Sequence, residues 1–163
     1  MSAHAQGNEG RIVQVRDAAA SDAAALADLA EQLGYPCTPE EMAMRLPVTG
    51  ESAHERVIVA EDPVKGVVGW ITVRETVHIH SAPYADVSGF VVDHASRGRG
   101  VGKLLMAEVE RWARARGLGA IRLSANIKRT EAHRFYESMG FRIIKTQYAL
   151  KKELVDASPH PGA

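Results

Sequence analysis

The chain has 163 residues, which is enough for one domain with a proper hydrophobic core. Lysine plus arginine and aspartate plus glutamate number 20 each, so no overall basic field favours nucleic acid, and no apolar run is long enough to cross a membrane. The single cysteine, Cys37, excludes an internal disulfide framework and is typical of the reducing cytoplasm.

We expect one domain over 11–154, with flexible tails at 1–10 and 155–163 and no signal peptide in the first tail. Thr38 and Glu41, three residues apart, predict a capping box that starts a short helix. Ser21 is expected to cap the helix before it. In chain order, the first half predicts a strand near 12–15, helices over 22–33 and 38–46, and antiparallel strands over 57–60, 67–77 and 84–92.

A glycine-rich basic loop follows these strands. It reads Arg97-Gly98-Arg99-Gly100-Val101-Gly102-Lys103 and leads into an amphipathic helix. Alternate glycines leave backbone N–H groups uncovered, and the helix start adds unpaired N–H groups and the positive end of the helix dipole. Together with the three cationic side chains, this predicts a site for a phosphate or pyrophosphate.

Two common phosphate-binding patterns fit this loop poorly. A P-loop requires Ser or Thr after its lysine to ligate magnesium, but Leu104 follows Lys103, and position 97 is not glycine. A dinucleotide-binding loop requires G-x-G-x-x-G after the first strand of a βαβ unit, whereas these glycines have a different spacing and lie past the middle of the chain. A nucleotide-binding protein is therefore disfavoured.

The second half predicts a βαβα unit in which both strands are parallel. A strand is expected over 120–125, a polar break at Asn126, and a second helix that stops at Gly140. A last strand is expected over 145–150. The apolar stripe of the first helix consists of Val101, Leu104, Leu105, Val109, Trp112 and Ala113.

Two motifs in order resemble those of the GNAT superfamily of N-acetyltransferases. The loop from Arg97 to Gly102 matches the family's pyrophosphate pattern R/Q-x-x-G-x-G/A, and Asn126 followed by 132–141 matches its second motif, A-x-x-F/L-Y-x-x-x-G-F. The segment 129–136 also resembles the branch that includes aminoalkylphosphonate acetyltransferases. The resemblance implies an α/β fold with a mixed sheet, in the order β-α-α-β-β-β-α-β-α-β.

The resemblance also implies acetyl-CoA as cosubstrate. The pyrophosphate is expected on Arg97, Gly98, Arg99, Gly100, Val101, Gly102 and Lys103. The pantetheine is expected in a gap between two splayed strands, where it would pair with backbone groups of Phe90, Val91 and Val92. A backbone N–H there would polarise the thioester carbonyl. Asn126, Arg129 and Phe135 are further expected cofactor contacts, although Asn126 could equally cap the strand and Arg129 could be solvated.

Catalytic roles are assigned to three residues. Tyr136 is expected to protonate the leaving thiolate by resemblance to the family tyrosine; the alternative is a core aromatic residue. Asp86, which alternates with Ser88 on one strand, is one expected base. His80, which shares a strand face with His78, is the other, because imidazole titrates near neutrality. Ordinary exposed histidines remain an alternative, and two ligands at this spacing are weak grounds for a metal, so none is expected.

The amine acceptor is not identified by the sequence. The segments 35–46 and 47–55 are expected to wall its pocket. Arg45, His54 and Arg56 favour an anionic substrate, whereas Glu40, Glu41 and Glu51 favour a cationic amine. A small-molecule acceptor is expected, with protein N-terminal or lysine acetylation, or acetyl-CoA sensing without turnover, as alternatives. A homodimer is left open, and neither nucleic acid nor a membrane is expected as a partner.

Overall fold

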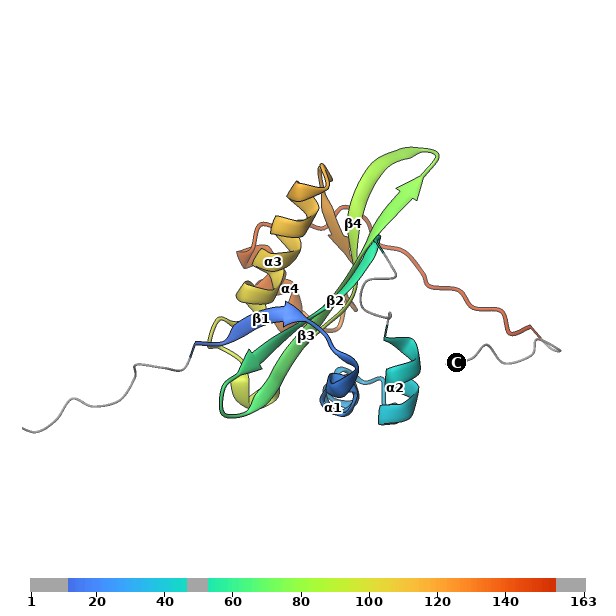
Figure 1. Ribbon diagram of the computed structural model, residues 1–163. Coiled ribbons are helices and arrows are strands. Elements are labelled where there is room, and N and C mark those ends of the chain that lie inside the picture. Colours follow the sequence, from blue (N-terminus) through green and yellow to red (C-terminus); the bar gives the residue numbers. More distant parts are fainter. Residues whose placement is uncertain (1–11, 47–52, 155–163) are drawn as a thin grey trace, which may run out of the picture.

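The computed structural model describes residues 12–46 and 53–154, and the expected tails at 1–10 and 155–163 and most of 47–55 lie outside them. Figure 1 shows the described elements. In chain order they are β1 (Gln14–Asp17), a 3-10 turn (Ala20–Asp22), α1 (Ala23–Leu33), α2 (Pro39–Arg45), β2 (Glu55–Asp62), β3 (Gly66–His78), β4 (Ser81–Val92), a second 3-10 turn (His94–Ser96), α3 (Val101–Ala115), β5 (Ile121–Leu123) and α4 (Thr130–Ser138).

Five strands form one sheet in the order β1-β2-β3-β4-β5. Neighbouring strands are antiparallel except β4 and β5, which are parallel. The α/β mixed sheet, antiparallel except where the phosphate-loop strand meets the next, is therefore confirmed. The parallel pair is joined by α3, as expected for a crossover connection that needs a helix to return the chain.

The expected last strand over 145–150 is wrong. After α4 the chain runs without helix or strand through residues 141–154, so the sheet has five strands rather than six. The local pattern of this segment suits a strand, but a strand also needs a neighbour for its backbone groups. In Figure 1 the segment leaves α4 and runs away from the sheet, and none of the described strands lies beside it.

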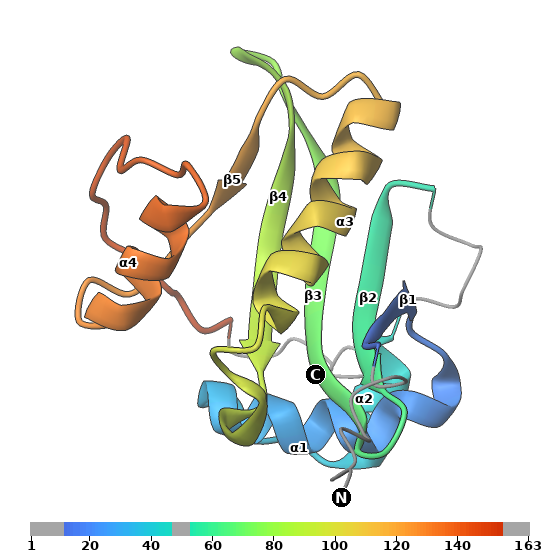
Figure 2. The same cartoon turned by 90° about the vertical axis from the view of Figure 1, so that its left-hand side faces the viewer.

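Two apolar layers cover the two faces of the sheet (Figure 2). On one face α3 packs Leu105, Met106 and Val109 against Ile58 and other sheet residues. On the opposite face α1 covers Trp70, Val59 and Val91. The expected stripe of α3 holds except at Leu104, which is 44% exposed. Successive side chains of a strand point to opposite faces of the sheet, so one set faces α3 and the other faces α1. In β3, Trp70, Thr72 and Arg74 belong to the set that faces α1.

A half-buried ion pair lies at the start of α1. The helix begins after Asp22 rather than after Ser21, because residues 20–22 form a 3-10 turn. Asp22 accepts two hydrogen bonds from the Arg16 guanidinium, at 2.7 and 3.0 Å, and one from the backbone N–H of Ala19 at 2.7 Å. The guanidinium beside it lowers the pKa of the Asp22 carboxyl. This pair connects β1 to the helix that covers the sheet.

Asp22→Asn should lower the free energy of unfolding near neutral pH by about 1.5–3 kcal/mol, as for hydrogen bonds to charged groups. Because the folded-state pKa is lower than the unfolded value, the stabilisation is present above about pH 4 and is lost as pH falls through the lowered pKa. Urea unfolding at about pH 7 and about pH 3 would measure the difference. Glu61→Gln removes the more exposed partner of Arg16 and should change stability by less than about 1 kcal/mol; an equal loss in both variants would contradict this account.

None of the described helices is both long and apolar enough to cross a membrane.

Candidate active site

The two parallel strands separate along their length. Their register pairs only three positions, residues 85–87 of β4 with residues 121–123 of β5. β4 continues to Val92 and stays paired with β3 on its other edge. Within the described residues, the second edge of β4 is therefore without a strand partner from Ser88 to Val92. Figure 2 shows β5 diverging from β4 toward α4. An extended ligand with amide groups could pair with this edge.

A bulge marks the point where the strands separate. Thr72 lies opposite Gly89 and Val73 opposite Val87, so Ser88 is the extra residue on β4. The Oγ atoms of Ser88 and Thr72 lie 2.9 Å apart. Gly89 is required here, since a Cβ at this position would lie 2.5 Å from the Trp70 ring. Bulges bend a strand and re-aim its side chains, which separates β4 from β5 beyond this point.

The glycine-rich loop lies directly beyond the open edge. It connects β4 to α3, and its residues 97–100 are exposed. Gly98 and Gly100 have φ values of 72° and 83°, which L-residues with a side chain rarely adopt. Gly100 is the N-cap of α3, so the first N–H groups of the helix face a loop that carries Arg97 and Arg99, and Lys103 lies in the first turn of the helix. This geometry suits an anion such as a pyrophosphate.

Hydrogen bonds that the sequence did not predict connect the start of the loop to α1. The Gln32 side chain donates to Asp93 Oδ1 at 3.1 Å and accepts from the backbone N–H of His94 at 3.1 Å. The amide of Gln32 and the nearby Ser96 hydroxyl lower the pKa of the Asp93 carboxyl. Because these residues are 61 positions apart, no local pattern links them. The bulge at Ser88, by contrast, had a signal in the sequence, because Gly89 is a glycine inside a strand.

The two motifs meet at Gly102. A Cβ at this position would lie 2.8 Å from the Phe135 ring and 3.3 Å from the Phe90 ring, so glycine lets α4 approach the start of α3. The ring centres of Phe90 and Phe135 are 5.7 Å apart, and those of Phe90 and Tyr136 are 6.2 Å apart. Tyr136 is thereby held next to the open edge of β4.

Tyr136 is half-buried in an aromatic cluster that also includes Phe141. Burial raises the pKa of its phenol, and the positive charge of Arg129 opposes this shift. The phenol therefore carries its proton at neutral pH, as a proton donor must. Arg129 immediately precedes α4 as its N-cap residue.

Asn126 and His133 stabilise the turn before α4. Asn126 Oδ1 accepts from the backbone N–H of Lys128 at 2.9 Å, and His133 Nε2 lies 2.9 Å from the Asn126 carbonyl oxygen. The oxygen of the Asn126 amide thus has a structural partner, while the NH₂ group of the same side chain is the end that can turn toward a ligand.

A row of alternating charge crosses the sheet beside the bulge. Glu55 lies opposite Arg74, Arg74 opposite Asp86, and Asp86 opposite Arg122 on β5. Residues directly opposite one another share a face, which here is the face of Thr72. Arg74 Nη2 lies 3.1 Å from Asp86 Oδ2. The Asp86 carboxylate is therefore paired with a guanidinium. Asp86 lies two positions before Ser88, the extra residue of the bulge.

His80 is not brought together with these residues. It lies in the turn between β3 and β4, exposed, at the far end of the hairpin from the bulge. Residues 81–87 of β4 lie between it and Ser88, so the two are about 26 Å apart along the strand at about 3.3 Å per residue. His78 stacks on His80 with ring centres 5.2 Å apart and places Nε2 3.0 Å from the Tyr84 hydroxyl. In the part of the chain that is described, no three His, Cys, Asp or Glu residues group as a metal site.

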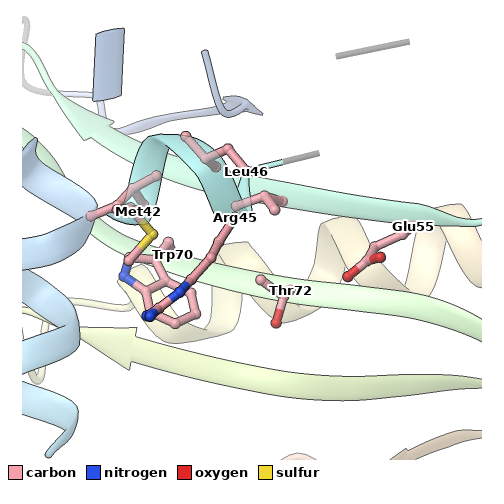
Figure 3. A pocket seen from close by; sticks show the side chains of 8 residues that line it. Met42, Arg45, Leu46, Glu55, Trp70 and Thr72 are labelled. Atoms are coloured by element: carbon pink, nitrogen blue, oxygen red, sulfur yellow. The ribbon is translucent and has the colours of Figure 1, made fainter. Parts of the chain in front are cut away.

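An open pocket of about 120 Å³ lies between α1, α2 and the sheet (Figure 3). Arg45 projects into it from α2 toward Trp70, with Thr72 and Glu55 on the strands below. Thr72 also contacts Ser88, so the pocket reaches the bulge. Its lining residues are Leu26, Met42, Arg45, Leu46, Glu55, Val57, Trp70 and Thr72.

Solved structures share this fold. An aminoglycoside N-acetyltransferase, AAC(6')-Iy in complex with CoA, is 17% identical, with a TM-score of 0.77 over 91% of this chain and 100% of that chain. A transcriptional regulator from Bacillus halodurans C-125 is 22% identical, with a TM-score of 0.74 over 86% of this chain and 100% of that chain. At these identities the likeness shows the fold.

The chain belongs to the acetyltransferase (GNAT) family, whose model matches residues 23–141. The resemblance found in the sequence is thereby confirmed. The uncharacterized N-acetyltransferase YhdJ of Bacillus subtilis (strain 168) is 40% identical over 68 residues, 41% of this chain and 48% of the relative. The aminoalkylphosphonate N-acetyltransferase of Salmonella typhimurium is 39% identical over 77 residues, 47% of this chain and 50% of the relative. The matches thus span about half the length of these curated relatives.

Proposed function

We propose that this chain is an acetyl-CoA-dependent N-acetyltransferase that moves the acetyl group to a primary amine within a ternary complex. The observation that carries the proposal is the unpaired edge of β4 from Ser88 to Val92, which lies between the glycine-rich loop and Tyr136. The edge offers backbone groups to the amides of pantetheine, and the loop at its end offers N–H groups and cations to a pyrophosphate. The order of these features along one edge suits one extended ligand that ends in a thioester.

In this proposal the loop and the strand orient acetyl-CoA, which supplies the thioester. Backbone N–H groups at 97–103 hold the pyrophosphate, helped by the side chains of Arg97, Arg99 and Lys103. Phe90, Val91 and Val92 pair with the pantetheine, and one of their N–H groups stabilises the negative charge that develops on the thioester oxygen. We call the space between the open edge of β4 (residues 88–92) and α4 the slot. Its α4 side is closed by Asn126, Arg129 and Phe135.

The reaction forms a bond between the amine nitrogen and the acetyl carbon and breaks the bond between that carbon and sulfur. The bonding pair leaves on sulfur, and the Tyr136 hydroxyl donates the proton that completes the CoA thiol. The raised pKa of Tyr136 supports this role, because the phenol is protonated at neutral pH. Asp86 accepts the amine proton through a water molecule near Ser88, since only a neutral amine can attack. His80 is left out because the hairpin carries it far from the slot.

We infer that the acceptor is a small molecule bearing both an amine and an anionic group. The pocket is small and combines the cation of Arg45 with the carboxylate of Glu55. A second cation and carboxylate, Arg74 and Asp86, form an ion pair next to the bulge. The name of the Salmonella relative, which acts on an aminoalkylphosphonate, supports the same class of acceptor.

Thermal unfolding with different ligands tests the cosubstrate. At a concentration about 100 times its dissociation constant, acetyl-CoA adds about 2.7 kcal/mol and raises the Tm by roughly 5–10 °C. ATP with magnesium should give no such shift, and the reverse ranking would end the proposal. Release of CoA thiol across aminophosphonates, amino acids, aminoglycosides and a lysine peptide then identifies the acceptor class. Binding without release by any acceptor would instead support a sensor.

EDTA should leave the rate of thiol release unchanged. The proposed steps use only protein groups and water, and the paired histidines His78 and His80 lie at the hairpin turn, away from the slot. The check is the rate before and after chelation, followed by addition of a divalent ion. A rate that vanishes with EDTA and returns with the ion would require a metal. His78→Ala and His80→Ala would then show whether these residues hold it.

A further inference from the structure

The pocket between α1, α2 and the sheet has an apolar end and a polar end. Leu26 and Trp70, which are 1% and 8% exposed, belong to its lining together with Met42 from α2. Thr72 and Glu55 contribute polar groups to the same lining. Figure 3 shows Met42 and the Trp70 ring at one end of the pocket and Thr72 and Glu55 toward the other. A molecule that fills the pocket therefore needs an apolar part and a polar part.

The described residues leave the apolar end unfilled. Among the residues of α2, Pro39–Arg45, none is buried. Met42, Leu46 and Val57 pack against the apolar layer that α1 covers, but they are only partly buried there. Apolar walls that face a gap lose the dispersion contacts that close packing gives. An apolar group of a ligand would supply those contacts and would itself leave water.

The volume of the pocket limits the apolar group that fits. A cavity of about 150 Å³ lined by Leu, Ile and Phe holds a benzene ring. The pocket has about 120 Å³, which is room for an alkyl group of about four carbons on that scale. A sugar ring suits the pocket poorly, because its hydroxyl groups would lie against Leu26 and Trp70 without hydrogen-bond partners.

The position of the polar end fixes the orientation of an acceptor. Thr72 Oγ1 lies 2.9 Å from Ser88 Oγ, so this end adjoins the bulge where the proposed slot begins. The amine must reach the thioester in the slot, so it belongs at this end. The alkyl group then points the other way, toward Trp70 and Met42. Arg45 is exposed and projects into the pocket from α2, where its charge can attract the acid group of the acceptor.

We propose that the acceptor carries, besides its amine and its acid group, an alkyl side chain of about four carbons that binds at the apolar end of the pocket. Leu26, Val57 and Trp70 are then specificity-determining residues, which bind the substrate and take no part in the bond-making steps. The proposal rests on the proposed function and deepens it, because it assigns the specificity of the acceptor site. A side chain buried equally in the ground state and the transition state raises kcat/KM through KM.

A graded series of acceptors tests this preference. The series consists of α-amino acids and 1-aminoalkylphosphonates whose side chain grows from hydrogen to butyl, measured with saturating acetyl-CoA. Each added carbon should raise kcat/KM about fourfold, which corresponds to about 0.8 kcal/mol per buried CH₂. A side chain that exceeds the pocket, such as naphthylmethyl, should lose this gain. An equal kcat/KM along the series, or the highest value for the compound with hydrogen, would overturn the proposal.

Val57→Phe should abolish the preference, because its larger ring occupies the space of the alkyl group. The compound with hydrogen should react as in the wild type, and the butyl compound should fall to the same kcat/KM. The matched control is Val67→Phe. Val67 is also a half-buried valine that packs against the same apolar layer, but it does not line the pocket, so this variant should keep the full preference. An unchanged preference in Val57→Phe contradicts the proposal, and the wild-type series decides alone if that variant does not fold.

The fluorescence of Trp70 separates this proposal from the proposed function. The chain has two tryptophans, so Trp112→Phe, in the α3 layer on the other face of the sheet, leaves Trp70 as the only one. Titration of this variant with the series measures binding without turnover, and Kd should fall about fourfold per carbon. Binding that tightens with length but releases no CoA thiol would reject the proposed reaction and keep the assignment of the pocket. Thiol release with no dependence on length would reject that assignment and keep the reaction.

Discussion

Gly100→Val should abolish the stabilisation by acetyl-CoA. Gly100 is the N-cap of α3 at a φ of 83°, and a β-branched residue is strained in that region, so the variant would move the loop out of position. The new side chain would also stand where the pyrophosphate approaches the N–H groups. If binding weakens a hundredfold, the stabilisation at the same ligand concentration falls from about 2.7 to about 0.4 kcal/mol. Thermal unfolding with and without acetyl-CoA measures this change.

The matched control is Gly117→Val, at the opposite end of the same helix. Gly117 has a φ of 71° and, like Gly100, open space where its Cβ would lie, so the backbone strain is similar. The control should therefore lower the Tm of the free protein by a similar amount but keep the shift with acetyl-CoA. Normal binding by Gly100→Val would mean that the loop is misassigned.

The loop and its helix were predictable because their signals are local. Glycines at alternate positions, the cations between them and an apolar stripe of period 3.6 all lie within one stretch of the chain. The capping box at Thr38 and Glu41 is likewise confirmed, with both of its hydrogen bonds present. The order of elements up to α4 followed from such signals.

Features that depend on strand pairing were harder to predict. The bulge at Ser88 and the anchoring of Asp93 by Gln32 arise only when β3 and α1 pack beside β4. The distance of His80 from the bulge was not predictable for a similar reason, because a shared strand face does not say how far along the hairpin a residue lies. The predicted last strand over 145–150 has the right alternation, but none of the strands that the structure describes pairs with it.

Tyr136→Phe should reduce turnover by about 10²–10⁴ if protonation of the thiolate limits the rate. The variant keeps the ring and therefore its contacts with Phe90, Phe135 and Phe141, so stability and affinity for acetyl-CoA should change little. The loss should fall on kcat, as expected for an interaction made in the transition state. The measurement is the rate of thiol release at saturating acetyl-CoA with the acceptor found in the panel.

Tyr148→Phe is the control, because Tyr148 is 95% exposed and lies outside the proposed site, so removal of its hydroxyl should not change kcat. CoA thiol is acidic enough to leave as thiolate with modest help, so the size of the loss reports how much the reaction depends on the donated proton. A profile against pH adds an independent readout: the wild type should lose activity as the pH rises through the raised pKa of Tyr136, and the variant should not. If Tyr136→Phe has the wild-type kcat under conditions where the chemical step limits the rate, the hydroxyl is not the proton donor. Tyr136 would then only pack in the aromatic cluster, and water would protonate the thiolate.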